Sequence, residues 1–179
     1  MRAALKLNAL LVLVFSGCLS EASDEVSKIK RQYDSMITMP EISIFRDHTL
    51  FASAKSSELF QENGKDIYLV GNLLSTFYDK DGNEMSVLRA DSGRINEKKY
   101  SMLATGDVVL ESVNGDALYT NELLWDNNNE TVSSNDTILF ISHSGDSLSG
   151  IGFESDVNLE NFLLIRKTSG VYKKRIADE

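Results

Sequence analysis

Few side chains in this sequence stand together in a pattern that supports chemistry, and the first such group is His143-Ser144-Gly145-Asp146. It combines the residue types of a nucleophile, a general base and an orienting carboxylate. Neighbouring residues of a strand point to opposite faces, so adjacent positions do not line up as a catalytic relay. His48 is the other histidine of the chain. We therefore expect no enzyme activity and no cofactor.

A second group, Asp79-Lys80-Asp81-Gly82-Asn83-Glu84, is similar to the start of a calcium-binding loop. Its glycine falls two residues too early for an EF-hand, and no helical pattern flanks it. We interpret it as a hairpin loop made of turn-forming Asp and Gly. A metal site built on His or Cys is not expected either, because the chain offers so few of these ligands.

The single cysteine, Cys18, follows a basic start with Arg2 and Lys6 and an apolar run from Leu7 to Phe15. That run of about nine residues is too short to cross a bilayer, which takes about 20. Small residues before a cysteine resemble the bacterial lipoprotein signal, in which the cysteine is acylated and becomes the mature N-terminus. The alternative is an ordinary secretory signal with an incidental cysteine. A lipidated Cys18 leaves the exported chain no internal disulfide, so packing alone must stabilise it.

The formal net charge of −9 and the pI near 4.8 argue against a nucleic-acid partner. No basic stripe is present to neutralise phosphates. A hydrophobic content of 42% in 179 residues is sufficient for one domain with its own core.

The architecture is predicted best by the stretch Thr105–Asp126. Two strand-like runs, Val108–Val113 and Ala117–Trp125, flank Asn114-Gly115. This dipeptide is a strong hairpin signal and favours a type I′ turn, which needs positive φ at both central residues. Both arms mix polar with apolar residues, as expected for an antiparallel sheet with one wet face and one apolar face.

Two short patterns recur along the chain. The first is a small residue, Gly or Asn, then Asn or Asp, then an aliphatic residue, at Val70–Leu73, Thr105–Val108 and Ser134–Ile138. The second is a turn glycine followed by a strand, at Gly82, Gly115 and Gly145, with spacings of 33 and 30 residues. A hairpin cannot bury its apolar side alone, so we expect stacked units that share one core.

No segment after Pro40 has a sustained helical period. The strand-like runs are Ile42–Ile44, Asp66–Tyr78, Met85–Asp91, Tyr100–Val113, Ala117–Asp126, Thr131–Ser142 and Leu159–Lys167. Turn signals separate them at the spacing of an all-β sandwich or open roll. We expect four parts: a lipoprotein signal at 1–17, a lipid-anchored tether at 18–40, a β domain at 41–167 and a polar tail at 168–179.

Large apolar residues of these strands are candidates for a core or for a lipid-binding trough. They are Tyr68, Phe77, Leu88, Leu103, Leu110, Leu118, Trp125, Phe140 and Phe153, with Leu163 as a further core candidate. Periodicity leaves both a closed core and an open trough possible. Trp125 and Phe153 follow turn glycines at matching places in two repeats, so we expect both to line the apolar interior.

The run Phe162-Leu163-Leu164-Ile165 lies near the chain end and contains neither charge nor proline. Edge strands normally carry charged residues or proline, because these residues prevent unwanted strand addition. We therefore predict a partner-binding edge here. The alternative is an interior strand whose outer edge is covered by the tail past Gly170.

An ordered set of motifs resembles the LptC family, the periplasmic, membrane-tethered component of the lipopolysaccharide-export ABC transporter. The motifs are Thr76–Gly82, Leu88–Gly93, Gly106–Val109, Asn114–Asp116, Leu118–Leu123, Trp125-Asp126 and Gly150–Asp156. The resemblance covers about Ile42 to Ile165. It implies a twisted, open β-jelly roll with a hydrophobic trough.

The resemblance also implies partners. Such proteins accept lipopolysaccharide from the permease subunits of an inner-membrane ABC transporter and pass it to a periplasmic bridge protein, here by edge-strand addition. Many members have an N-terminal transmembrane helix, which an acyl anchor on Cys18 would replace at the periplasmic face of the inner membrane. Two alternatives are the soluble bridge protein of the same superfamily and an outer-membrane structural or adhesive lipoprotein.

Overall fold

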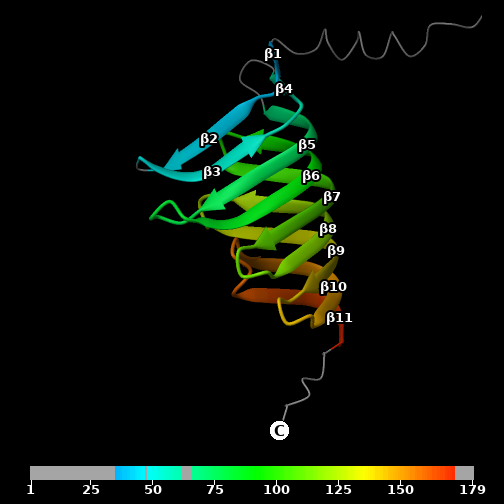
Figure 1. The fold of residues 1–179 in the computed structure, drawn as a ribbon. Helices are drawn as coiled ribbons and strands as arrows, with labels where there is room; N and C mark the ends of the chain where they lie inside the picture. Colours follow the sequence, from blue (N-terminus) through cyan, green and yellow to red (C-terminus); the bar gives the residue numbers. More distant parts are fainter. Residues whose placement is uncertain (1–34, 47, 62–65, 172–179) are drawn as a thin grey trace, which may run out of the picture. The chain divides into compact units, whose positions relative to one another are not determined.

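A computed structural model describes residues 35–46, 48–61 and 66–171, and these residues form β-strands joined by turns (Figure 1). The predicted signal, Cys18 and most of the tether lie outside the described residues. Within the described ranges we find no helix that could cross a membrane. The all-β prediction is confirmed.

The strands are listed here in chain order. They are β1 Ser35–Thr38, β2 Glu41–Arg46, β3 Thr49–Lys55, β4 Glu58–Gln61, β5 Ile67–Tyr78, β6 Glu84–Asn96, β7 Ser101–Ser112, β8 Ala117–Asp126, β9 Thr131–Ile141, β10 Ser147–Asp156 and β11 Phe162–Val171.

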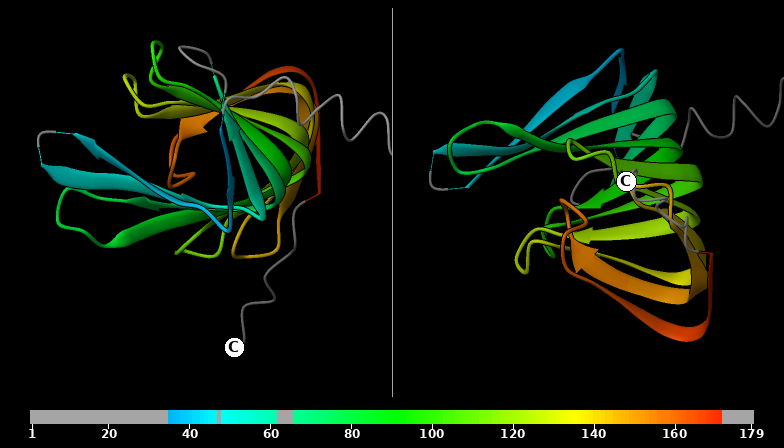
Figure 2. Two further views of the ribbon diagram at one scale, coloured as in Figure 1. Left: turned by 90° about the horizontal axis from the view of Figure 1, so that it is seen from above. Right: turned by 60° about the horizontal axis from the view of Figure 1, so that its bottom comes forward.

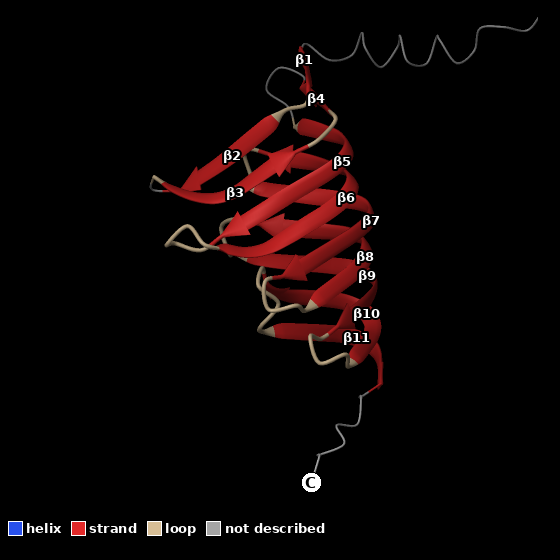
Figure 3. Cartoon of the chain, viewed as in Figure 1, coloured by secondary structure: helices blue, strands red, loops and turns tan. Residues whose placement is uncertain are grey.

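All of these strands belong to one antiparallel sheet, drawn in red in Figure 3. From β5 to β11 each strand pairs with the next one in the chain. The free side of β5 pairs with β3 along one half and with β4 along the other. β2 then adds to β3, and β1 adds to β4. Among the described strands, β11 pairs with β10 alone and therefore forms the edge at the C-terminal end of the sheet.

Most of the long strands change register near their midpoints, and these irregularities are aligned across the sheet. They fall at Val70–Leu73 in β5, Arg89–Ser92 in β6, Thr105–Val108 in β7, Tyr119–Leu124 in β8 and Ile151–Phe153 in β10. A bulge bends its strand, so an aligned row of bulges folds the sheet over. The view from above shows the two resulting layers, with the turns of both layers on the open side (Figure 2, left).

Glycine makes the tightest of these bends possible. Gly71 and Gly106 have φ of 76° and 80°, and the residues after them, Asn72 and Asp107, have φ of 52° and 40°. Glycine adopts positive φ without a steric penalty, and Asn and Asp tolerate it better than most residues. The first repeated pattern of the sequence therefore marks the bends.

The N-terminal strands follow the same plan, with breaks where the longer strands have bulges. The Ser57 amide donates to the Gly71 carbonyl, and the Met39 amide donates to the Ser57 carbonyl, both at 2.8 Å. Pro40, the expected domain boundary, thus lies at a bend inside the sheet. Ser35–Thr38, expected in the tether, forms β1, because its backbone pairs with β4 although its four side chains are exposed. Exposed strands of four residues leave no apolar period in a sequence.

The C-terminal boundary also differs from expectation. β11 begins at Phe162 rather than Leu159 and continues to Val171, four residues into the expected tail. Its last residues pair with the start of β10, Val171 with Ser147 and Gly170 with Leu148. The last residues of this edge strand have the polar composition of a tail, because one side of the strand faces solvent.

The second repeated pattern marks three hairpin turns with one hydrogen-bonding scheme. Gly82, Gly115 and Gly145 have φ near +90° and donate their amides to the carbonyls three residues earlier. The hairpin at Asn114-Gly115 is confirmed, since β7 pairs with β8. The type I′ prediction is wrong: Asn114 is not among the described residues with positive φ, and three residues separate the closing pair Ser112 and Asp116. A three-residue loop with its glycine in the left-handed region accounts for both observations.

Asp79 organises the loop that resembled a calcium site. Its carboxylate accepts the backbone amides of Asp81 and Asn83 at 2.8 and 2.9 Å, and the side-chain amide of Asn83 at 2.9 Å. The hydrogen bond from the Asn83 side chain is the main cause that lowers the pKa of Asp79. The carboxylate thus closes a hairpin loop, as the sequence analysis predicted.

Candidate functional site: an apolar interior with two openings

The inner face of the first layer carries a row of large apolar side chains. Leu88, Leu110, Leu118 and Phe140 are cross-strand partners in β6, β7, β8 and β9, and each is at most 4% exposed. Side chains directly opposite each other in an antiparallel sheet touch, so the row is continuous. Four of the predicted trough residues therefore share one wall.

Trp125 belongs to a similar row in the second layer, between Met102 of β7 and Val132 of β9. It is 3% exposed, and its ring meets Phe77 edge to face with centroids 5.1 Å apart. Phe77 comes from the half of β5 that pairs with the first layer. This aromatic pair joins the two layers near the middle of the interior.

A first opening reaches the interior beside the β2–β3 hairpin. Its volume is about 270 Å³, and its apolar lining includes Ile42, Ile44, Ile67, Ile95 and Trp125. Ile42 and Ile44 are partly buried against the core. The alternation predicted for Ile42–Ile44 thus directs both side chains inward, where they cover this end of the interior.

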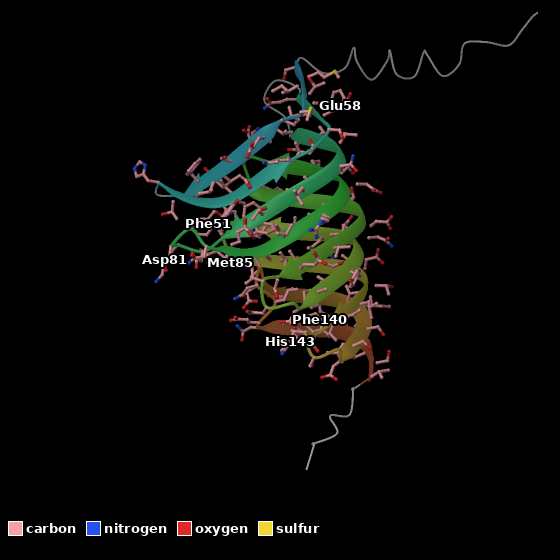
Figure 4. The ribbon with its side chains drawn as sticks, in the orientation of Figure 1. Phe51, Glu58, Asp81, Met85, Phe140 and His143 are labelled. Atoms are coloured by element: carbon pink, nitrogen blue, oxygen red, sulfur yellow. The ribbon has the colours of Figure 1, made fainter. Side chains whose placement is uncertain are left out.

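A second opening, of about 200 Å³, lies between the two sets of turns. Phe51, Phe77, Met85, Trp125 and Val157 supply its apolar lining. Figure 4 shows Phe51 and Met85 on the same side of the sheet, near the loop that carries Asp81. Trp125 lines both openings, so it lies where the two approach each other.

The C-terminal end of the interior is filled with side chains. Phe153 is fully buried. The centroid of the Phe162 ring lies 5.8 Å from that of Phe153 and 4.5 Å from that of Phe140. Val157 and Leu159, from the connection between β10 and β11, are 6% and 1% exposed. The sequence analysis missed these two residues as interior positions, because a connection carries no strand period.

Two predicted trough residues lie on the other face of the sheet. Tyr68 and Leu103 are half-buried, and both are cross-strand partners of the exposed Arg94. Their neighbours Leu69 and Met102 point inward instead. In β5 and β7 the buried positions keep the same parity along the strand, from Leu69 to Phe77 and from Met102 to Leu110, so a two-residue count places Tyr68 and Leu103 on the outer face. The remaining seven, Phe77, Leu88, Leu110, Leu118, Trp125, Phe140 and Phe153, are buried.

The expected partner edge lies on β11, where successive side chains alternate between faces. Leu163 and Ile165 are 62% and 51% exposed, whereas Leu164 is partly buried against the core. The prediction of Leu163 as a core residue is therefore wrong. The continuous apolar run arises because one face of an edge strand covers the core and the other faces outward.

The residues of His143–Asp146 serve the β9–β10 turn. His143 Nδ1 lies 3.3 Å from Asp116 Oδ1, and the Ser144 hydroxyl hydrogen-bonds to Ser142 and Asp146. The His143 side chain is 63% exposed. Its contact joins the β7–β8 turn to the β9–β10 turn.

The interior between the two β-layers is apolar and is reached through two small openings. The family model described as "Lipopolysaccharide-assembly, LptC-related" matches residues 7–173. The chain therefore belongs to the LptC family, whose members are lipopolysaccharide-transport components of the periplasm, associated with the inner membrane, and not enzymes. Lipopolysaccharide, the export transporter and the bridge protein are partners of that family in general. The search of curated proteins found no match to this chain.

Proposed function

We propose that this chain receives lipopolysaccharide from an inner-membrane ABC transporter, shelters its acyl chains between the two β-layers and passes it to a periplasmic bridge protein. The observation that carries the proposal is the apolar interior with Trp125 at both openings, in a chain of the LptC family. The acyl chains are the part of such a lipid that needs shelter, since each buried CH₂ contributes about 0.8 kcal/mol. The formal net charge of −9 favours solubility.

The openings also define how binding proceeds. Volumes of about 270 and 200 Å³ lie below the roughly 300 Å³ at which ligand pockets usually begin. Entry of an acyl chain therefore requires the covering side chains to move. Binding that replaces apolar contacts by other apolar contacts is reversible, which a carrier needs for handover.

A photo-cross-linking amino acid at Trp125 is expected to capture lipopolysaccharide in cells that make it. The same amino acid at Leu103 is the matched control, because Leu103 is half-buried on the opposite face. Capture would be read by immunoblotting for lipopolysaccharide on the purified protein. Equal capture at both positions, or capture of protein alone at Trp125, would contradict an interior lipid path.

Membrane attachment through an acylated Cys18 at the periplasmic face of the inner membrane is part of the proposal. Its support is the position of Cys18 directly after a short apolar segment and two small residues. Cys18→Ser is expected to abolish palmitate incorporation and lipoprotein processing. Ser16→Ala, which keeps a small residue next to the cysteine, is expected to leave labelling intact. Palmitate labelling that persists in Cys18→Ser would show that the anchor is elsewhere.

The β11 edge is the proposed docking site for the bridge protein. An edge strand offers unpaired backbone amides and carbonyls, which a partner strand can satisfy by β-augmentation. Exposed Leu163 and Ile165 on this strand add apolar area beside that ladder. The interior would then continue from one sheet into the next.

A further inference from the structure

The connection from β10 to β11, residues 157–161, folds into the interior of the sheet. Val157 and Leu159 are 6% and 1% exposed, although both belong to a turn and not to a strand. The β6–β7 connection on the same open side is different, since residues 97–100 are all exposed. Burial of two apolar side chains by an irregular segment is a specific feature of this end of the sheet.

This connection also reaches across the open side. In the view from above it lies, in orange, between the two sets of turns (Figure 2, left). The Asn114 side-chain amide, in the β7–β8 turn of the opposite layer, donates to Glu160 Oε1 at 3.3 Å. This contact is long and exposed, so it holds the connection in place weakly.

The conformation of the connection carries unfavourable features. Leu159 has φ of +63°, a left-handed conformation that is costly for a leucine. Asn158 Oδ1 is buried and has no hydrogen-bond partner within the described part of the chain. Burial of Val157 and Leu159 offsets both costs. A segment balanced in this way is ready to move when another apolar group takes the place of its two side chains.

Asp156 allows the connection to move as a unit. Its carboxylate accepts the backbone amides of Glu160 and Asn161 at 2.9 and 3.3 Å, and the Asn161 side-chain amide at 2.8 Å. These bonds lie within the connection and its flanks, so they can persist when Leu159 leaves the interior. The expected movement is a swing about Asp156 and Asn161.

We propose that residues 157–161 are an internal plug: Val157 and Leu159 occupy the C-terminal part of the acyl-chain path, and an entering acyl chain displaces them outward. This inference rests on the proposed function. It makes the passage toward β11 conditional on lipid, so that the interior next to the docking edge is closed in the empty protein. It also accounts for the small volume of the second opening, which Val157 and Asn158 line.

The test measures whether lipid brings position 159 out of the interior. The full-length chain carrying Leu159→Cys is treated with a maleimide, with and without purified lipopolysaccharide in detergent, and labelling at position 159 is read by mass spectrometry. Labelling is expected to accelerate about tenfold or more with lipid, as for a site whose open state becomes the populated one. Leu110→Cys is the matched control: Leu110 is fully buried within a strand, and its labelling should stay slow. Val157→Cys provides a second reporter if Leu159→Cys fails to fold.

Fluorescence of Trp125, the single tryptophan, reports lipid entry independently in the same samples. A fluorescence change together with faster labelling at position 159 or 157 supports the plug. A fluorescence change with unchanged or slower labelling overturns the plug and leaves the proposed function standing. No fluorescence change and no labelling change with lipid would overturn the interior lipid path, and the plug with it.

Discussion

Gly106→Val is expected to lower the free energy of unfolding by about 3 kcal/mol or more, because it combines backbone strain with a steric clash. Gly106 has φ of +80°, which a β-branched residue adopts only at high cost. A Cβ at this position would lie 2.8 Å from the Asp91 Cβ and would also clash with Asp91 Oδ2. The bend of β7 therefore touches the bend of β6, and chemical denaturation should show a large loss of stability.

Gly82→Val separates the two causes. Gly82 has φ of +85°, close to that of Gly106, but a Cβ there would meet nothing within 4 Å. In Gly82→Val the free energy of unfolding should fall by only about 1–2 kcal/mol, because this variant has the strained left-handed backbone but no clash. Adding Asp91→Gly to Gly106→Val should restore part of the extra stability that Gly106→Val loses relative to Gly82→Val, because it removes the clashing side chain. Equal losses in the two single variants would show that the bends of β6 and β7 are not in close contact.

The same glycines show what the sequence does and does not reveal. Both repeated patterns can be recognised in the sequence. The turn glycines Gly115 and Gly145 were placed correctly, because the dipeptides Asn-Gly and Ser-Gly indicate turns locally. Gly71 and Gly106 have equally positive φ but lie in mid-strand. Their role depends on the neighbouring strand, since a bend is useful only where every strand bends at the same line.

The faces of the strands could be predicted only in part for the same reason. Phe77 and Trp125 lie on the inner face as expected, whereas Tyr68 and Leu103 lie an odd number of residues from the buried Phe77 and Leu110 and therefore on the outer face. In β8 the buried positions change parity at the register shift, from Leu118 to Leu123 and Trp125, so a two-residue count fails across that bend. The exact position of a bulge is set by pairing across strands, which the sequence does not state.

Burial of Val157 and Leu159 was the least predictable feature of the candidate site. The segment Asp156–Asn161 is short and largely polar, so its composition is that of a solvent-exposed turn. Its inward position follows from the space at the end of the two layers and from the hydrogen bonds that Asp156 accepts. Neither is a property of the local sequence.

Lysine at two exposed positions of β11 is expected to weaken capture of the bridge protein strongly. Leu163 and Ile165 lie on the outer face of the edge strand and are 62% and 51% exposed. Charged side chains on an edge strand oppose the addition of another strand, because the approaching backbone would have to desolvate them. Leu163→Lys/Ile165→Lys should therefore weaken capture of the purified bridge protein at least about tenfold, a change of about 1.4 kcal/mol.

Substitution is a sharper test here than truncation of β11. Truncation after Glu160 would remove Phe162, whose ring packs against Phe140 and Phe153, and would uncover the core. The double lysine variant leaves Phe162 and the partly buried Leu164 in place, so its circular dichroism and its denaturation midpoint should match those of the unmodified chain. Tyr100→Lys/Val113→Lys is the matched control, because these residues are 61% and 63% exposed and lie in turns away from β11. It adds the same charge and should retain full capture. Undiminished capture by the β11 variant would place the docking site on another part of the sheet, and equal loss in both variants would point to net charge rather than to the edge.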